Sequence, residues 1–283
     1  MGYLWQQAGN FLMWLLVTFY ELARRVSEGS AWGLAIIALT LLVRAAMHPL
    51  TQKQMNSMQK MQKLQPRVKV LQEKYQDDKE TMNREVMALY RENKVNPAAG
   101  CLPLLIQLPI LILFYNVLRD ASAREDFLNA TFLTIRLGGS FMSTIAEAVN
   151  LVMINAEGIP VPVDTSQLGA WVGPVSVVYS AFSNSSLLFQ NVAMWLPNTL
   201  LLVLMGFLTW YQQRLVSSGN PQMAMMTWFM PLFLTWICLN IPGGVLLYWG
   251  VSSLLGVAHQ LRVMRRTNLE MKEKPVLLKE KPK

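Results

Sequence analysis

Arg44 lies inside an apolar run of the sequence, where a charged side chain needs an explanation. The run extends from Ala31 to Leu50, and Arg44 stands six residues before its end. About twenty apolar residues in a helix are enough to cross the hydrocarbon core of a bilayer. With a rise of about 1.5 Å per residue, Arg44 lies about 9 Å from the inner end of such a span. The guanidinium therefore belongs inside the membrane or at its inner boundary.

Two explanations for Arg44 are open. The long side chain could snorkel, with its stem in lipid and its charged head at the inner interface. Alternatively, Arg44 could face a water-filled cavity that opens to the inside. The long apolar runs of the chain contain no Asp or Glu, so no carboxylate within a span can pair with Arg44. An unpaired cation in this place favours water or an incoming anionic partner.

Polar residues in the other apolar runs are the candidates for the same site. Thr40 precedes Arg44 by four residues, so both lie on one helix face. The further candidates are Gln107, Gln212, Ser252 and Ser253. Each of them alone is explained by ordinary hydrogen bonds between membrane helices. Together with Arg44 they predict a wet, positively charged hollow in the inner half of a helix bundle.

The composition requires a membrane protein. The 283 residues are 53% hydrophobic and only 15% charged. We predict one all-α domain, residues 31–263, with spans at 31–50, 101–118, 192–215, 223–239 and 245–263. Residues 1–30 contain a shorter apolar stretch, which predicts an amphipathic helix in the outer interface, with a sixth span as the alternative.

The distribution of charge predicts the topology. Residues 51–100 carry ten Lys and Arg against six acidic residues, and the tail from Arg262 carries eight against three. Residues 119–192 carry three against six. Basic residues near membrane ends mark the inner side. We therefore expect the N-terminus and the segment 119–191 outside, and the region 51–96 and the basic tail 264–283 in the cytoplasm.

Residues 51–96 have the pattern of a helical hairpin. Apolar residues recur every three or four positions, and Asp77, with Glu80 three residues later, predicts the cap of the second helix. The residues proposed for recruitment of partners are Met55, Met58, Met61, Lys60, Lys63 and Asp77. The methionines could be internal packing or an adaptable apolar surface. The lysines could be solvated, or could contact anionic lipid or ribosomal RNA.

Signatures of an enzyme are missing from the sequence. It contains no nucleotide-binding loop, no dinucleotide turn, no zinc-protease motif and no nucleophile elbow. Without acidic residues in the spans, proton-coupled or sodium-coupled transport also lacks its usual chemistry. The two cysteines, Cys101 and Cys238, are expected to be packing residues. His48 and His259 are expected at interfaces rather than on a metal. We expect no cofactor and no metal.

Three blocks of the sequence stand out together. They are the span around Arg44 with the following "HPLTQKQMNSMQKMQKLQPRVKVLQEKYQDD", then "NPAAGCLPLLIQLPILILFYNVL", and finally "IPGGVLLYWGVSSLLGV". In this order and spacing they resemble the YidC family of membrane protein insertases. The resemblance covers about 31–119 and 192–263. It implies a five-span bundle with a groove that is open to the cytoplasm and to lipid and is closed on the outside.

The resemblance also implies roles for single residues. Arg44 would be the groove cation, Thr40 its neighbour, Gln212 a polar groove residue and Trp249 an aromatic contact of the substrate. The substrate would be a nascent membrane protein, which enters lipid along the third and fifth spans without nucleotide hydrolysis. Further expected partners are the ribosome, the secretory translocon and anionic lipids. The expected location is the bacterial plasma membrane.

The sequence departs from the family pattern in two ways. It contains no large outer domain before the first span, so we expect a short form of the family. The segment 119–191 is longer than the pattern requires. Two other functions stay open: a lipid scramblase or small-solute channel that uses the same polar hollow, and a purely structural assembly factor. Flux of lipid or solute without any protein substrate would indicate the first, and indifference to replacement of Arg44 would indicate the second.

Overall fold

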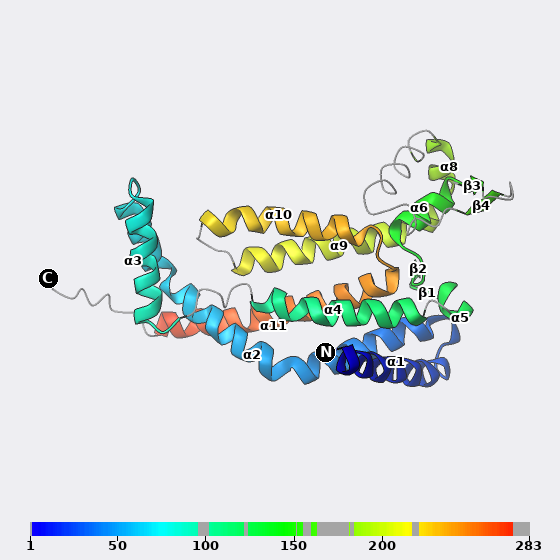
Figure 1. Cartoon of the computed structure of the whole chain (residues 1–283), viewed down its shortest axis with the longest axis horizontal. Coiled ribbons are helices and arrows are strands. Elements are labelled where there is room, and N and C mark those ends of the chain that lie inside the picture. Colours follow the sequence, from blue (N-terminus) through cyan, green and yellow to red (C-terminus); the bar gives the residue numbers. More distant parts are fainter. Residues whose placement is uncertain are drawn as a thin grey trace.

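The computed structural model describes residues 2–95, 102–121, 124–150, 152–154, 160–162, 181, 184–216 and 221–273. The chain is mostly helical, and the long helices lie side by side along the long axis of the molecule (Figure 1). These are α2 (Ala31–Lys74), α4 (Leu102–Ala121), α9 (Val192–Val216), α10 (Pro221–Cys238) and α11 (Gly243–Glu273), and a further long helix, α1 (Gly2–Arg24), crosses them. The shorter helices are η1 (Glu28–Ser30), α3 (Lys79–Glu92), α5 (Glu125–Leu128), α6 (Phe141–Ala148) and α8 (Ser185–Gln190).

Helix α11 is the central element of the bundle. It packs against α2 on one side and α9 on another, while α10 covers α9 and α4 contacts α11. The core between these helices is apolar and aromatic, and the stacked rings of Phe114 and Tyr248, with centroids 3.9 Å apart, join α4 to α11. Such close packing fixes the helices relative to one another and therefore positions the polar residues on them.

Within the described residues, three helical regions are long and apolar enough to cross a membrane. They are Glu28–Lys74, Val192–Leu215 and Gly243–Arg265. Helix α10 has a shorter apolar stretch, Trp228–Cys238. Cys101 and the side chains of the first residues of α4 lie outside the described residues. The chain is thus built to lie in a membrane, and the number of five spans stays a prediction.

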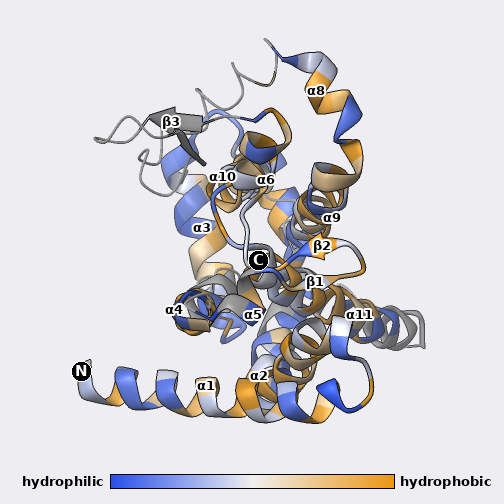
Figure 2. Cartoon of the chain, turned by 90° about the vertical axis from the view of Figure 1, so that its right-hand side faces the viewer, coloured by the Kyte–Doolittle hydropathy of each residue, from blue (hydrophilic) through white to orange (hydrophobic). Residues whose placement is uncertain are grey.

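Helix α1 crosses the bundle instead of running along it. Figure 2 shows α1 from the side, whereas α4, α9 and α11 are viewed end-on. It packs on α2 and α4, where Leu16 and Tyr20 are buried. Tyr20 stacks on Trp32 at a centroid distance of 4.0 Å. This crosswise course is compatible with the predicted interfacial helix, whose position in a membrane stays a prediction.

Helix α2 joins two regions that the sequence separates. The predicted span 31–50 and the first arm of the predicted hairpin 51–96 form one helix from Ala31 to Lys74, which continues through Pro49 and Pro66. Each proline removes one hydrogen bond of the helix, yet the helix continues. The change from apolar to polar residues at position 50 is therefore not a helix end.

The predicted cap of the second hairpin helix was wrong by one residue. Helix α3 begins at Lys79, and its cap is Asp78, whose side chain accepts a hydrogen bond from the Thr81 N–H at 3.0 Å. Asp77 is exposed in the preceding turn. The hydrogen bond from Thr81 holds the pKa of Asp78 below its ordinary value. In a pair of adjacent aspartates, the pattern alone does not decide which one caps.

The second half of α2 packs on α3 through a small apolar cluster. Met61, Leu64 and Val68 of α2 are buried against Tyr90 and Val95. Burial raises the pKa of the Tyr90 hydroxyl. This region and the segment that contains α5 to α8 lie at opposite ends of the bundle (Figure 1).

The segment 119–191 contains strands as well as helices, which the all-α prediction did not include. Strands β1 (Thr131–Phe132) and β2 (Ile135–Arg136) pair antiparallel, and so do β3 (Val152–Ile154) and β4 (Pro160–Pro162). The two residues between β1 and β2, Leu133 and Thr134, have φ of 49° and 69°. Strands this short have no clear alternation of apolar and polar residues. Residues 163–180 of this segment and 274–283 of the tail lie outside the described residues.

Candidate functional site

Arg44 of α2 reaches across to α11 and binds Ser252. Its Nε donates to the Ser252 hydroxyl at 2.8 Å, and its Nη2 donates to the Ser252 carbonyl at 2.6 Å. The Ser252 side chain is buried and the Arg44 side chain is half-buried. An arginine has five N–H donors. Ser252 accepts from two of them, so the guanidinium keeps the capacity to bind water or an anionic group.

Gln212 of α9 makes the matching contact on the next residue of α11. Its Nε2 donates to the Ser253 carbonyl at 2.7 Å. Arg44 and Gln212 thus both donate to backbone carbonyls of α11 in the turn before Gly256. A Cβ at this position would lie 2.7 Å from Gln212 Nε2 and 3.7 Å from Arg44 Nη2. The glycine therefore leaves the space in which side chains from α2 and α9 meet on α11.

A second polar pair lies one helical turn earlier on α11. The amide nitrogen of Gln107 donates to the Tyr248 hydroxyl at 2.9 Å. Tyr248 lies four residues before Ser252, the residue that Arg44 binds. Polar side chains from α2, α4 and α9 thus converge on one stretch of α11, residues 248–256. Three of the predicted site residues, Arg44, Gln107 and Gln212, belong to this group.

Two other predicted site residues lie elsewhere. Thr40 is fully buried, and its hydroxyl donates to the Ile36 carbonyl of its own helix at 2.6 Å. Trp249 is 6% exposed and packs in the apolar core. The structure does not bring either of them to the Arg44–Ser252 contact, and their roles toward a substrate stay predictions. Tyr248 and Gly256 were missed because neither residue type is unusual in a membrane helix.

The predicted recruitment residues divide into buried and exposed ones. Met55 is buried against Val263 of α11, and Met61 is buried in the cluster with α3. Lys60 and Lys63 are exposed, and the side chain of Met58 lies outside the described residues. Met55 and Met61 therefore pack within the chain. Of the predicted set, the exposed Lys60 and Lys63 are the residues that could contact a partner.

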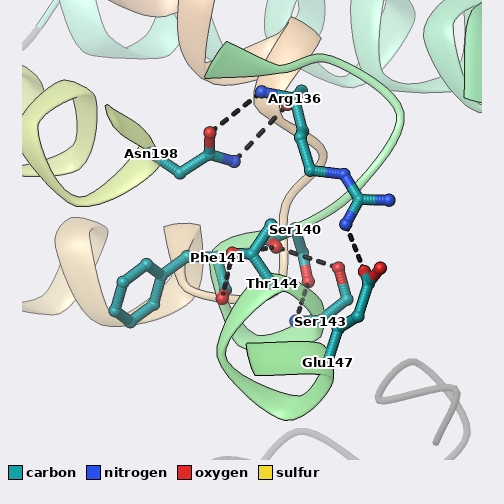
Figure 3. Close-up of polar contacts among 7 residues, drawn as sticks. All are labelled: Arg136, Ser140, Phe141, Ser143, Thr144, Glu147 and Asn198. Atoms are coloured by element: carbon teal, nitrogen blue, oxygen red, sulfur yellow. Dashed lines mark hydrogen bonds and ion pairs between the residues drawn. The ribbon is translucent and has the colours of Figure 1, made fainter. Parts of the chain in front are cut away.

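The end of the bundle that carries α5 to α8, which the predicted topology makes the outer end, is held together by β2 and the residues that follow it. Asn198 of α9 is fully buried and bonds the backbone of Arg136, accepting from its N–H at 3.0 Å and donating to its carbonyl at 3.4 Å (Figure 3). The Arg136 side chain pairs with Glu147 of α6. Helix α6 is capped by Ser140, which accepts from the Ser143 N–H. These contacts attach the outer segment to α9.

The residues that follow β2 also hold the first turn of α11. The N–H groups of Gly243 and Gly244 donate to the carbonyls of Gly139 and Leu137, each at 2.8 Å. A Cβ on Gly243 would collide with the Arg136 carbonyl, so only glycine allows this approach. On the α2 side, the Phe132 ring lies directly on Gly33. Residues 132–139 therefore contact α2, α9 and α11 at this end of the bundle, and we call them the outer wedge. Arg44 lies farther along the bundle.

The charges of the site are unbalanced in the part of the chain that the structure describes. No carboxylate pairs with Arg44 there, and the ion pairs Arg124–Asp126 and Arg136–Glu147 belong to the segment 119–191. Groups of three or more metal-binding side chains are also absent from the described residues. The site therefore offers a positive charge and hydrogen-bond donors, which suit an acidic or polar group.

Comparison with known proteins identifies the family. The model of the 60Kd inner membrane protein family matches residues 24–272. The chain is 36% identical to "Inner membrane ALBINO3-like protein 2, chloroplastic" of Chlamydomonas reinhardtii, with 93% of this chain and 57% of that protein covered. It is 33% identical to "Membrane protein insertase YidC" of Syntrophobacter fumaroxidans, with 90% and 37% covered. The chain thus spans 57% or less of the length of these two relatives.

A shorter relative and a solved structure agree with these matches. "Membrane protein insertase YidC" of Fusobacterium nucleatum is 32% identical, with 94% of this chain and 99% of that protein covered. The crystal structure of an active YidC insertase with its first transmembrane domain resolved has a TM-score of 0.56 at 26% identity. The match covers 88% of this chain and 45% of that one. The resemblance seen in the sequence is confirmed: the chain belongs to the 60Kd inner membrane protein family, which is the family of the YidC membrane protein insertases.

Proposed function

We propose that this protein inserts membrane proteins: it guides hydrophobic segments of nascent chains from the cytoplasm into the bilayer, without nucleotide hydrolysis. The observation that carries the proposal is the environment of Arg44. The guanidinium is half-buried between candidate spans and is bound to the neutral Ser252, with no carboxylate on it in the described residues. Charged residues inside a membrane bundle pair with other charges or with backbone carbonyls, and because Ser252 takes only two of the five N–H donors of Arg44, the others can receive a polar or acidic group of a substrate.

Electrostatics gives Arg44 its role in this proposal. A fixed cation in a region of reduced dielectric attracts the acidic or polar part of a substrate more strongly than it would in water. It also disfavours basic segments, which then stay on the cytoplasmic side, as the distribution of charge in membrane proteins requires. Gln212 and Gln107 would offer further hydrogen bonds to the polar part, while Thr40 and Trp249 would act from the adjacent core.

The driving force would come from the apolar part of the substrate. Transfer of apolar surface from water to lipid releases about 25 cal/mol per Å². The barrier is the short polar tail, which must cross the hydrocarbon. A hydrated hollow that reaches Arg44 shortens the dry distance and lowers this barrier. The wedge at the outer ends of α2, α9 and α11 supports closure on the outside, and the substrate would leave along α9 and α11.

The topology and the partners belong to the same proposal. We place the N-terminus outside and the C-terminus in the cytoplasm of a bacterial plasma membrane, because the basic region 51–96 and the tail lie on the inner side by charge. The exposed lysines of α2 would meet anionic lipids or the ribosome. The secretory translocon is a further partner that the family resemblance suggests.

The test is insertion of a single-span protein with an acidic tail into vesicles that contain the purified chain. Arg44→Ala should lower the inserted fraction about tenfold or more, since hydrogen bonds to charged groups contribute about 1.5–3 kcal/mol and 1.4 kcal/mol is a factor of ten. Arg44→Lys should restore part of the activity, because it keeps the charge without the planar fork. Arg214→Ala is the matched control, since this arginine lies over the Trp210 ring of its own helix. Equal insertion by the parent and Arg44→Ala would contradict the proposal.

The scramblase or channel alternative makes a different prediction for the same vesicles. It requires transfer of labelled lipid or of a small ion without any protein substrate, and this flux should depend on Arg44. Vesicles that insert the test protein but stay tight to lipid and ions support the insertase. Flux without insertion supports the alternative.

A further inference from the structure

The two histidines of the chain meet each other. The sequence contains only His48 and His259, and the fold brings them together from α2 and α11. Their ring centroids lie 5.5 Å apart and the rings are at 80°, edge to face. His48 follows Arg44 by four residues and His259 follows Ser252 by seven, so both lie on the faces that carry the Arg44–Ser252 contact. The pair therefore extends the line of contacts between α2 and α11, which we call the α2–α11 seam.

Contacts on both sides of the pair show that this seam is continuous. On one side is the Arg44–Ser252 contact. On the other, Met55 packs on Val263, and Gln59 Nε2 donates to the Val263 carbonyl at 3.3 Å. A change at the histidines would therefore act on the approach between the inner parts of α2 and α11, next to the Arg44 site.

The groups around His259 are neutral or positively charged. His48 is exposed, but His259 is half-buried, and its Nε2 is buried without a hydrogen-bond partner in the described structure. The charged and titratable groups that act on His259 are His48 and Arg44 from α2 and Arg262 from its own helix. From α9, Gln212 is neutral and Arg214 lies on Trp210. No carboxylate is among the described groups that act on His259.

We propose that His48 and His259 form a proton-sensitive latch. Neutral rings pack edge to face and hold the inner parts of α2 and α11 together. Protonation of His259 places a cation against the His48 ring, beside Arg44 and Arg262, and the helices separate. By linkage, the separated state binds more protons than the closed one, so the closed state is favoured above the ordinary histidine pKa of about 6.5 and is lost as the pH falls below it.

This latch would regulate the site proposed above, and that consequence rests on the proposed function. Separation of α2 from α11 would widen the inner approach to Arg44. It would also raise the positive charge there, which favours acidic segments of a substrate. We expect insertion of an acidic-tailed protein to be faster at about pH 5.5 than at about pH 8, on the two sides of the histidine pKa.

The direct test measures the distance between α2 and α11 in vesicles by electron spin resonance. Spin labels on Ala46→Cys and Ala258→Cys occupy exposed positions of the two helices, with Cys101 and Cys238 replaced by alanine. The distance distribution should be short at about pH 8 and shift to longer values at about pH 5.5, on either side of the histidine pKa. A second label pair, Leu200→Cys and Ile237→Cys on α9 and α10, should not shift.

Variants of the histidines make the test specific. His48→Gln combined with His259→Gln keeps polar side chains that do not titrate, and it should hold the short distance at both pH values. His259→Lys carries a charge throughout and should give the longer distance at both. The latch is refuted if the parent distribution does not change with pH, if the glutamine variant shifts equally, or if both label pairs shift together.

The same samples separate the latch from the proposed function. A pH-dependent distance in a protein that inserts no substrate at any pH would leave the latch in place and refute the insertase. Insertion that depends on Arg44, with a distance that does not respond to pH, would support the insertase and refute the latch.

Discussion

Asn198 of α9 and Arg136 of β2 exchange two hydrogen bonds, side chain to backbone, at the outer end of the bundle. The amide of Asn198 is fully buried and satisfies both main-chain groups of one residue. Asn198 thereby supplies the hydrogen bonds that a further strand would supply to the backbone of β2 in a larger sheet. Because β2 is followed by the residues that hold Gly243 and Gly244, this contact ties α9 to the first turn of α11.

Replacement of Asn198 by alanine should loosen the outer wedge. Two buried backbone groups would lose their partners, and each unsatisfied group is expected to lower the free energy of unfolding by about 1–3 kcal/mol. Asn198→Leu should be equally unfavourable although it fills the space. Thr199→Val is the control, because the Thr199 hydroxyl donates to Trp195 of its own helix. Thermal unfolding in detergent measures stability, and leakage of a small ion from vesicles measures closure.

Gly256 and Gly250 give a matched pair on α11. Alanine is normally better than glycine in a helix by about 1 kcal/mol. At Gly250 a Cβ would meet Leu201 at an ordinary 3.5 Å, so Gly250→Ala should be neutral or stabilising. At Gly256 it would lie 2.7 Å from Gln212 Nε2 and displace that side chain from the Ser253 carbonyl. Gly256→Ala should therefore be less stable than Gly250→Ala by about 1–2 kcal/mol.

A double variant checks the cause of the Gly256 effect. If the clash with Gln212 is responsible, Gly256→Ala should become stabilising in a Gln212→Ala background, since the displaced group is gone. Additive effects of the two substitutions would show that the residues act independently and would contradict the contact. Chemical unfolding of the four proteins of this cycle in detergent is the measurement.

The sequence predicted the helices well and the contacts between them poorly. Apolar runs fix where helices cross a membrane, and the helices α9 and α10 begin and end within two residues of the predicted spans. The predicted span ends at position 50, where the residues become polar, whereas the helix continues to Lys74. Hydropathy reports the solvent around a helix, not its end.

The composition of the site was partly predictable, but its geometry was not. Arg44 was recognisable because a charge in an apolar run is costly. That Ser252 binds it depends on the register between two helices far apart in sequence. The same register places Tyr248 in the polar group and buries its neighbour Trp249 in the core. If α11 were rotated by one residue, Trp249 would take the place of Tyr248. The pattern of apolar residues within α11 does not determine this rotation.

The N-terminus of α3 should respond to acid through Asp78. Its pKa is lowered by the hydrogen bond from Thr81, so its contribution to stability is fully present above the ordinary pKa of about 3.9 and is lost as the pH falls through the lowered native value. Asp78→Asn should keep the cap and remove this pH dependence, and Asp78→Ala should lose the cap at every pH. Asp77→Ala is the control and should behave as the parent. Hydrogen exchange in the first turn of α3 distinguishes these variants.

Val68 and Val70 test whether the packing of α2 on α3 is a real structural unit. Val68 is fully buried in the cluster with Tyr90, whereas Val70, two residues later on the same helix, is 62% exposed. Val68→Ala removes two buried methyl groups and leaves a cavity, so it should lower the free energy of opening of α3 by about 1–3 kcal/mol. Val70→Ala should change it by less than about 0.5 kcal/mol. Amide exchange along α3 measures this free energy. Equal exchange in the two variants would mean that α3 does not depend on α2 for its stability, and the packing of the two helices would have to be abandoned.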